Sequence, residues 1–486
     1  MYARRYLGTR AKTRRQADDW QAGVAQTESM MHTITSAPPV TRMPPPAPSR
    51  LRGTDLPIIA VGVPAIALLL WLLDGGPALV TGSFEGALTG IGQLAGLAAG
   101  LAALGGLALA ARPANVERRY GLDRMLGWHR WTGMVAAFAL LLHVVTLLAA
   151  YSLRAGTNPL SEVAFLFGQD WMPAAMAGGA LMALVSLTSW RRIKQRMTYE
   201  TWYYLHVLGY LAVALALGHV LVMGSDFVDN AIARAWWIGL YVLVAAVIAW
   251  SRLRPLVASL RHPVKVTSVE RLPDGAMSVW LAGPVLAGGM GAAPGQFFSL
   301  RFATRGLWWQ SHPYSLSAAP FTTGLRFTFT LGDDAAEFAR IKVGTRVWLE
   351  GPYGTFTAAK AGDSPVVLVG GGSGIAPIRA ILEDLTPANR PVVVLRISRR
   401  EDAWFLPELQ QLVDRLGGRL HVVLGSRVSL APRDPLSAAA FAELVPDVSG
   451  RVGFVCGPTG MTRAAMRGLR GAGMRASNLH TERYVY

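Results

Sequence analysis

Two apolar stretches that begin and end with histidine decide the fold: HRWTGMVAAFALLLH at residues 129–143 and HVLGYLAVALALGH at residues 206–219. Both are apolar enough to lie inside a membrane-spanning helix. Ionisable side chains are rare within a bilayer, and where they occur they usually mark a functional site. The sequence therefore predicts a membrane-embedded site that uses His129, His143, His206 and His219.

Four further stretches of low charge and high hydropathy lie around these two in the first half of the chain. The six candidate spans cover residues 56–73, 87–111, 131–153, 171–190, 201–224 and 235–251. Each is close to the roughly 20 residues that cross a bilayer. The alternative, buried core helices of a soluble protein, does not explain so many apolar stretches in succession. A content of 52% hydrophobic and 16% charged residues also excludes a purely soluble chain and a disordered one.

The charges of the loops predict the orientation. Basic residues gather before the first span and in the second and fourth loops, at Arg112, Arg118, Arg119, Arg124, Arg191, Arg192, Lys194 and Arg196. The first, third and fifth loops hold only Arg154 and Arg234. By the positive-inside rule, the N-terminus, the even-numbered loops and everything after the sixth span are cytoplasmic. Membrane-flanking loops thus explain the net charge of +17 better than a nucleic-acid partner does.

Residues 1–55 precede the first span and are basic and rich in proline. They contain no apolar core within their first 30 residues, so they do not read as a secretory signal peptide. We interpret them as a disordered cytoplasmic leader.

The four histidines form two pairs at matching depths. The third and fifth spans are parallel, so His129 and His206 are expected near the cytoplasmic face, with His143 and His219 deeper toward the other leaflet. Separations of 14 and 13 residues correspond to about 21 and 19.5 Å along a helix, a distance that suits two stacked haems. Around the helix axis, two histidines 14 residues apart point within about 40° of each other, whereas two histidines 13 residues apart differ by about 140°. The fifth helix is therefore expected to be overwound, or its two histidines to approach from different angles. The alternative is four hydrogen-bonded core histidines.

The chain changes character after the sixth span. Short β-rich segments separated by Gly, Pro and Asp fill residues 262–360 and predict a small antiparallel barrel. The segment includes His312-Pro313-Tyr314-Ser315, which in isolation reads as a turn with an aromatic, and Gly351-Pro352-Tyr353-Gly354-Thr355-Phe356.

Residues 364–486 change again, to buried strands that alternate with helical patterns. PVVLV is followed by Gly370-Gly371-Gly372-Ser373-Gly374-Ile375-Ala376-Pro377 and then by the helix-like IRAILEDL. A strand, a glycine-rich turn and a helix N-terminus form a phosphate cradle. The later strand VVVLRIS ends at Ser398-Arg399-Arg400, where an arginine can grip a 2′-phosphate and favour NADPH over NADH; a solvated basic turn is the alternative. The single cysteine, Cys456, excludes an intrachain disulfide, a cysteine-based zinc site and an iron–sulfur cluster.

Taken together, the spacing of the histidines inside a six-span unit resembles the ferric-reductase/NADPH-oxidase superfamily. The resemblance implies two b-type haems, with His129 and His206 on the inner one and His143 and His219 on the outer one. The motifs after the sixth span resemble the ferredoxin–NADP reductase superfamily. The implied architecture is a six-helix transmembrane haem bundle (56–255), an antiparallel β-barrel FAD domain (262–360) and an α/β Rossmann-like NADPH domain (364–486).

The same resemblance implies roles for individual residues. Tyr314 would pack against the isoalloxazine and Ser315 would hydrogen-bond near N5, while His312, next to Pro313, would lie near the FAD pyrophosphate and Gly354 and Thr355 would let backbone N–H groups approach the phosphates. The pyridine-nucleotide loop would comprise Gly371, Gly372, Ser373, Gly374 and Pro377, with Ser398 and Arg399 on the 2′-phosphate.

The C-terminal part of the chain completes this predicted site. Cys456, Gly457 and Pro458 would lie near the nicotinamide, although Cys456 could equally be a packing residue. Glu482 and Tyr484 look like the family's terminal Glu-x-aromatic, in which the aromatic covers the flavin; a two-residue overhang leaves Tyr486 as the other candidate.

The predicted function is transmembrane electron transfer from cytoplasmic NADPH, or NADH, through FAD and two haems to an extracytoplasmic small-molecule acceptor. The acceptor is either O₂, giving superoxide, or a ferric chelate. Leu147 stands where animal oxidases of the family have a further histidine, and the second span has no arginine. Both departures weaken a dedicated oxygen site. A membrane-bound electron donor serving a partner protein is the alternative of another class.

Overall fold

The computed structural model describes residues 55–223, 230–272, 275–286, 289–321, 324–332, 335–397, 403–425 and 434–482. The predicted leader lies outside these residues, apart from Asp55. Within them, six helices are long and apolar enough to cross a membrane, which confirms the six predicted spans. They are α2 (Asp55–Leu73), α4 (Phe84–Ala110), α6 (Leu122–Ala155), α8 (Met172–Ser189), α10 (Tyr199–Met223) and α12 (Ala231–Arg261).

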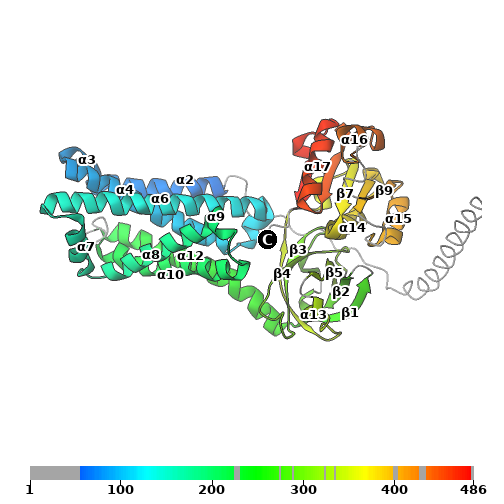
Figure 1. The fold of residues 1–486 in the computed structure, drawn as a ribbon, viewed down its shortest axis with the longest axis horizontal. Helices are drawn as coiled ribbons and strands as arrows, with labels where there is room; N and C mark the ends of the chain where they lie inside the picture. The colour runs from blue at the N-terminus through cyan, green and yellow to red at the C-terminus, as the bar shows by residue number, and fades with distance from the viewer. Residues whose placement is uncertain are drawn as a thin grey trace, which may run out of the picture.

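These helices run side by side in a bundle, and the sheets of the second half lie at one end of it (Figure 1). Helix α6 packs mainly on α4, and α10 packs mainly on α8. Large apolar side chains such as Phe138 and Leu141 are 72% and 61% exposed, as expected of surfaces that face lipid. Short helices occupy the connections: α3 (Gly76–Gly82), α5 (Ala114–Tyr120), α7 (Pro159–Phe167) and α9 (Arg191–Lys194).

Glycines on α4 let α6 approach closely. A Cβ placed on Gly96 would lie 2.6 Å from Nδ1 of His143, and one on Gly92 would lie 2.6 Å from Cδ2 of Leu147. Van der Waals packing between small residues is the usual way in which membrane helices associate. The glycine-rich sequence of α4 therefore brings its backbone against the histidine-bearing helix.

The first sheet is antiparallel and has the strand order β4-β3-β6-β1-β2-β5. Its strands are β1 (Val264–Leu272), β2 (Ala276–Ala282), β3 (Phe297–Phe302), β4 (His312–Ser315), β5 (Gly324–Thr330) and β6 (Arg346–Tyr353). The ladder is not closed: its two edges meet only through an isolated bridge between Leu316 and Phe327. The antiparallel sheet is thus as predicted, but the barrel is not confirmed.

His312–Ser315 is a strand, so the interpretation of this motif as a turn was wrong. The strand is short and lies at the edge of the sheet, paired only with β3 in the ladder. An edge position tolerates Pro313, because a proline has no N–H to donate to a second neighbour.

The second sheet is parallel, with the order β11-β10-β7-β8-β9. Its strands are β7 (Val366–Gly371), β8 (Val392–Ile397), β9 (Arg419–Leu424), β10 (Val452–Cys456) and β11 (Leu479–Glu482). The main crossover helices are α14 (Ile375–Asp384), α15 (Leu406–Arg415), α16 (Ala438–Leu444) and α17 (Thr459–Gly471). Two separate clusters of buried apolar residues pack on this sheet, as expected of a doubly wound α/β fold.

Candidate functional site

The four membrane histidines face one another in the predicted pairs. The ring centroids of His129 and His206 are 5.8 Å apart, and those of His143 and His219 are 6.4 Å apart. Two imidazoles that share one metal ion through bonds of about 2 Å place their centroids about 6 Å apart. Both pairs therefore have a separation at which the two imidazoles could bind one metal ion.

The hydrogen bonds of the rings fix which nitrogen is available. Nδ1 of His129 lies 2.9 Å from the Gly106 carbonyl oxygen, and Nδ1 of His143 lies 2.8 Å from that of Gly92. A carbonyl oxygen only accepts, so Nδ1 carries the proton in both rings and Nε2 keeps its lone pair. This backbone-anchored arrangement is typical of metal-ligating histidine. The donor set fits a haem iron.

The histidines of α10 are held differently. Nδ1 of His206 lies 3.1 Å from Oγ of Ser189, and the ring stacks on Trp202 at a centroid distance of 5.0 Å. Nδ1 of His219 is buried without a hydrogen-bond partner among the described residues. Helix α10 is unbroken between the two histidines, so neither ligand depends on a break in the helix.

In the first sheet, the His312–Ser315 strand lies among aromatic rings. Tyr314 stacks on Phe329 with ring centroids 3.9 Å apart, and His312 makes an edge contact with Phe338 at 5.2 Å. Ser315 is buried and pairs with Phe297 of β3. The motif is thus a rigid, aromatic-backed strand, as a planar ring system would require of its binding surface.

The turn that follows β6 is tied to this strand by Gln296, a residue that the motif search missed. The Gln296 side chain donates to the carbonyl oxygen of Gly354 (2.9 Å), and its backbone carbonyl accepts from the N–H of Leu316 (2.9 Å). Gly354 adopts a φ of 92°, which favours glycine. A Cβ there would lie 3.5 Å from Oε1 of Glu482. The sequence feature that could have identified Gln296 is the Pro-Gly-Gln turn immediately before strand β3.

The described residues of the predicted nucleotide site meet at the carboxyl ends of the central strands of the parallel sheet. Strand β7 lies between β8 and β10, so the direction of the crossovers reverses between β7 and β10. Ligands of such sheets bind at the carboxyl ends of the strands at this reversal. Gly370 and Glu482 are both in register with Cys456, from the two sides of β10.

Close backbone packing holds these strand ends together. A Cβ on Gly374 would collide with the backbone of Cys456 and Gly457, so the turn formed by Gly372–Gly374 sits directly on the end of β10. Gly372 has a φ of 55° and Gly457 a φ of 152°. Pro377 is buried in the first turn of α14, and Pro458 precedes α17. Ser373 lies in the turn itself.

Cys456 is completely buried and belongs to the apolar cluster on one face of the sheet. Three other candidates, Ser398, Arg399 and Tyr484, lie outside the described residues, as does Tyr486. Glu482 is the last residue that the structure describes.

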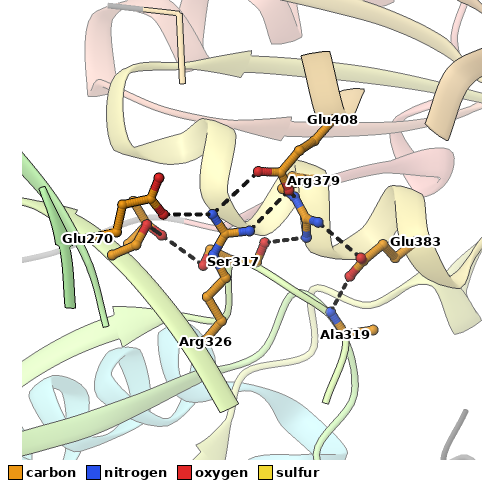
Figure 2. A network of polar contacts seen from close by, with 9 residues as sticks. Glu270, Ser317, Ala319, Arg326, Arg379, Glu383 and Glu408 are labelled. Atoms are coloured by element: carbon orange, nitrogen blue, oxygen red, sulfur yellow. Dashed lines mark hydrogen bonds and ion pairs between the residues drawn. The ribbon is translucent and has the colours of Figure 1, made fainter. Parts of the chain in front are cut away.

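A cluster of charged residues joins the two sheets (Figure 2). Oε2 of Glu408, from α15, accepts from Arg326 Nη1 of β5 at 3.0 Å and from Arg379 Nε of α14 at 2.6 Å. Arg379 also donates to the carbonyl oxygen of Ser317 (2.8 Å) and to Glu383 (3.0 Å). Burial alone would raise the pKa of the Glu408 carboxyl, but the two guanidinium groups hold it below its ordinary value. No sequence motif indicates this cluster.

Two family models match the chain, one in each half. Residues 90–217 match the ferric reductase like transmembrane component, and residues 368–467 match the oxidoreductase NAD-binding domain. The first range contains His129, His143 and His206 and ends two residues before His219, and the second contains the glycine-rich turn and Cys456.

Curated relatives are similar over part of the chain. The ferredoxin reductase component of 3-ketosteroid-9-alpha-monooxygenase from Mycolicibacterium smegmatis is 32% identical, covering 39% of this chain and 55% of that protein. A flavohemoprotein from Chromobacterium violaceum is 31% identical, covering 39% of this chain and 52% of that protein. The chain thus spans about half the length of these relatives.

Solved structures show lower similarity. A cytochrome P450 reductase from Amycolatopsis is 22% identical with a TM-score of 0.38, covering 46% of this chain and 69% of that one. A flavohemoglobin from Malassezia yamatoensis with bound FAD and heme is 16% identical with a TM-score of 0.40, covering 89% and 99%.

The two family matches lie in one polypeptide, the membrane component before the NAD-binding domain. A reductase-type flavin and nicotinamide module follows a six-helix membrane component in a single polypeptide. Over these two ranges the chain is therefore similar to the ferric reductase/NADPH oxidase-like superfamily, with an oxidoreductase NAD-binding domain after helices that are apolar enough to cross a membrane.

Proposed function

We propose that the protein carries electrons from cytoplasmic NADPH through FAD and two b-type haems to an acceptor on the opposite side of the membrane. The observation that carries the proposal is the pair of histidine couples on α6 and α10, with centroid separations of 5.8 and 6.4 Å. His129 and His143 are 14 positions apart on α6, or about 21 Å along the helix. Two sites stacked at that spacing would divide the path of an electron across the hydrocarbon layer into short transfers.

When bound, flavin turns a two-electron donor into one-electron steps and haem carries single electrons through a medium hostile to charge. The chain's own residues supply the ligands and their orientation. The Gly106 and Gly92 carbonyls hold His129 and His143 in the tautomer whose Nε2 can bind iron. His206 and His219 would complete the inner and outer pairs from the opposite helix.

The cytoplasmic residues would bind and orient the two nucleotides. We assign the FAD site to residues 262–360, where His312–Ser315 supplies an aromatic-backed surface and the Gly354–Thr355 turn supplies backbone N–H groups. We assign the NADPH site to residues 364–486, where the Gly371–Gly374 turn and Pro377 open α14 beside Cys456-Gly457-Pro458. Glu482 lies at the point where the two sites meet, near Gly354.

The cytoplasmic placement of both sheets follows from the basic second and fourth loops and the basic segment before α2. Both sheets lie at one end of the bundle (Figure 1), and α5 of the second loop contacts β6 of the first sheet. We place His129 and His206 at this end, because His129 stands near the start of α6.

The acceptor is a ferric chelate or O₂. Leu147 packs against Gly92 instead of providing a further imidazole, and α4 contains no arginine. A second candidate function is electron donation to a partner protein. It is favoured by the relatives' names, which include the ferredoxin reductase component of a ketosteroid monooxygenase and the reductase component of propane 2-monooxygenase.

The proposal is tested by purifying the full chain in detergent with added FAD and following superoxide and Fe(II) formation in parallel with NADPH. We expect one of the two products to form at twice the rate of NADPH consumption, because NADPH gives two electrons and each product takes one. If neither product forms and NADPH is oxidised only after a protein acceptor is added, the donor-subunit function is favoured. No NADPH oxidation with any acceptor would exclude both.

Arg399 is expected to select NADPH. Arg399→Ala should raise KM for NADPH by roughly ten- to a hundred-fold and leave KM for NADH nearly unchanged, because a charge-assisted contact contributes about 1.5–3 kcal/mol. Steady-state kinetics with both nucleotides measures this. An equal effect on NADPH and NADH would show that Arg399 does not read the 2′-phosphate.

A further inference from the structure

The membrane bundle and the first sheet touch at two ends of one strand, β6. At one end, Arg346 donates to the carbonyl oxygen of Ser259 near the end of α12 (2.7 Å). At the other end, helix α5 packs against the strand and against the turn after Tyr353. The approach there is close: a Cβ on Gly121 would lie 3.4 Å from Oγ1 of Thr355.

A carboxyl group is buried at this second contact. Glu117 of α5 is only 1% exposed, and no hydrogen bond of ordinary geometry reaches its carboxylate oxygens from the described residues, although the Gly354 backbone N–H lies close enough to favour the ionised form. An ionised carboxylate without partners is costly to bury, whereas a neutral carboxyl is much less so. Burial accordingly raises the pKa of Glu117 to about 7. The positive charge of Arg112 and the backbone N–H of Gly354 act in the opposite direction, because both favour the ionised carboxylate.

The charged and titratable groups around this position come from every element that meets there. Arg112 precedes α5, Glu350 and Tyr353 belong to β6, and Arg252 belongs to α12. The carboxylate oxygens of Glu350 lie 3.9 Å from guanidinium nitrogens of Arg252 and Arg301, so Glu350 forms ion pairs with these two residues. Tyr353 is buried beside Glu350 and Glu117. Its burial, and to a smaller extent the negative charges of these two residues, raises its pKa to about 12. Oε1 of Glu482 would lie 3.5 Å from a Cβ on Gly354.

We propose that Glu117 is a positioning residue: its protonated carboxyl lets the turn at Tyr353, Gly354 and Thr355 seat against the membrane bundle, and its ionisation releases that turn. The proposal goes beyond the electron path, because it concerns how the two halves of the protein are held together. The turn is also a candidate wall of the flavin site, so its seating sets the distance between that site and His129.

The direction of the pH dependence follows from the two states of Glu117. In the seated state its pKa is about 7, whereas a solvated carboxyl has the ordinary value of 4.5. The contact is therefore fully stable below the ordinary value, weakens by up to about tenfold per pH unit as pH rises toward 7, and weakens no further above that.

The experiment is hydrogen exchange with mass spectrometry on the full chain in detergent, following peptides that cover residues 114–121 and 353–357. After correction for intrinsic exchange rates, the open population of the wild type should rise roughly twentyfold between pH 5.5 and 7.5. Glu117→Gln keeps a neutral side chain at all pH values. Its protection should therefore be independent of pH and should exceed that of the wild type at pH 5.5 by roughly tenfold, because a solvated Glu117 is already mostly ionised at that pH.

A second variant tests the sign of the shift. Arg112→Gln removes a positive charge that favours ionised Glu117, so protection should go on falling above pH 7. Glu443→Gln, on the exposed face of α16, should match the wild type. The peptide covering β7, which is buried throughout, should show constant protection at every pH.

Two results would overturn the proposal. One is wild-type protection at residues 353–357 that does not change between pH 5.5 and 7.5. The other is a Glu117→Gln profile that still follows the wild type. If Glu117→Gln does not fold, the wild-type and Arg112→Gln profiles decide: parallel profiles with the same bend would show that another group titrates at the contact.

Discussion

Replacing His143 with alanine should leave the purified protein with one haem in place of two, and replacing His129 as well should leave none. Each proposed haem depends on one histidine from α6 and one from α10, so removing either ligand of a pair removes the six-coordinate site. His206→Ala should act like His129→Ala, and His219→Ala like His143→Ala. A pyridine haemochrome assay gives the haem content per chain, and the absorption spectrum should show low-spin iron in the wild type.

A milder variant tests the packing behind this result. Gly96→Ala places a methyl group where the His143 ring lies, because a Cβ there would be 2.6 Å from Nδ1. It should reduce the outer haem and spare the inner one. His421→Ala, in strand β9 of the cytoplasmic half, should keep both haems. One haem or none in the wild type, or equal losses in the His421 variant, would refute the assignment.

The membrane half was predictable because its signal is local. A span is recognised from about 20 consecutive residues, and the six helices agree with the six stretches. The structure extends several of them, since α6 begins at Leu122 and α12 continues to Arg261. A helix does not end where the hydrocarbon ends, so hydropathy locates the apolar window and not the helix termini.

The pairing of the histidines was also predictable, because depth in a membrane follows from residue number and span direction. Their hydrogen bonds were not. The Gly106 and Gly92 carbonyls that anchor His129 and His143 belong to α4, and nothing in a sequence states which helix packs on which. The glycines of α4 indicated close packing without naming the partner.

The cytoplasmic half divides in the same way. The glycine-rich turn and Cys456 were found separately, and the parallel sheet brought them together by placing β10 beside β7. The predicted barrel is an open sheet, because alternating strands predict antiparallel pairing without stating whether the edges join. Glu117 was overlooked because a glutamate in a basic loop normally lies in water. Its burial depends on a strand more than 200 residues later.

Replacing Glu408 with alanine should destabilise the cytoplasmic half by about 3 kcal/mol and lower its Tm by roughly 10 °C. The side chains of Arg326 and Arg379 are each only 8% exposed, and Glu408 bonds to both. Removing the carboxylate leaves two largely buried guanidinium groups short of a partner. Arg379 keeps Glu383 and the Ser317 carbonyl, whereas Arg326 keeps only the more distant Glu270, at 3.9 Å, among its described ion pairs. Thermal unfolding followed by flavin fluorescence measures the change.

The effect should depend on pH and on the partner. The pKa of Glu408 lies below its ordinary value, so its contribution is present at neutral pH and is lost as pH falls through that lowered pKa. The gap in Tm between wild type and Glu408→Ala should therefore close in acid. Gln410→Ala, on the exposed side of the same helix, should change stability by less than about 0.5 kcal/mol. Adding Arg326→Met to Glu408→Ala should recover part of the loss, because it removes the stranded charge as well as its partner. If the double variant loses more free energy of unfolding than the two single variants lose together, Arg326 is held by its contacts with Trp280 and Phe405 and not by the carboxylate.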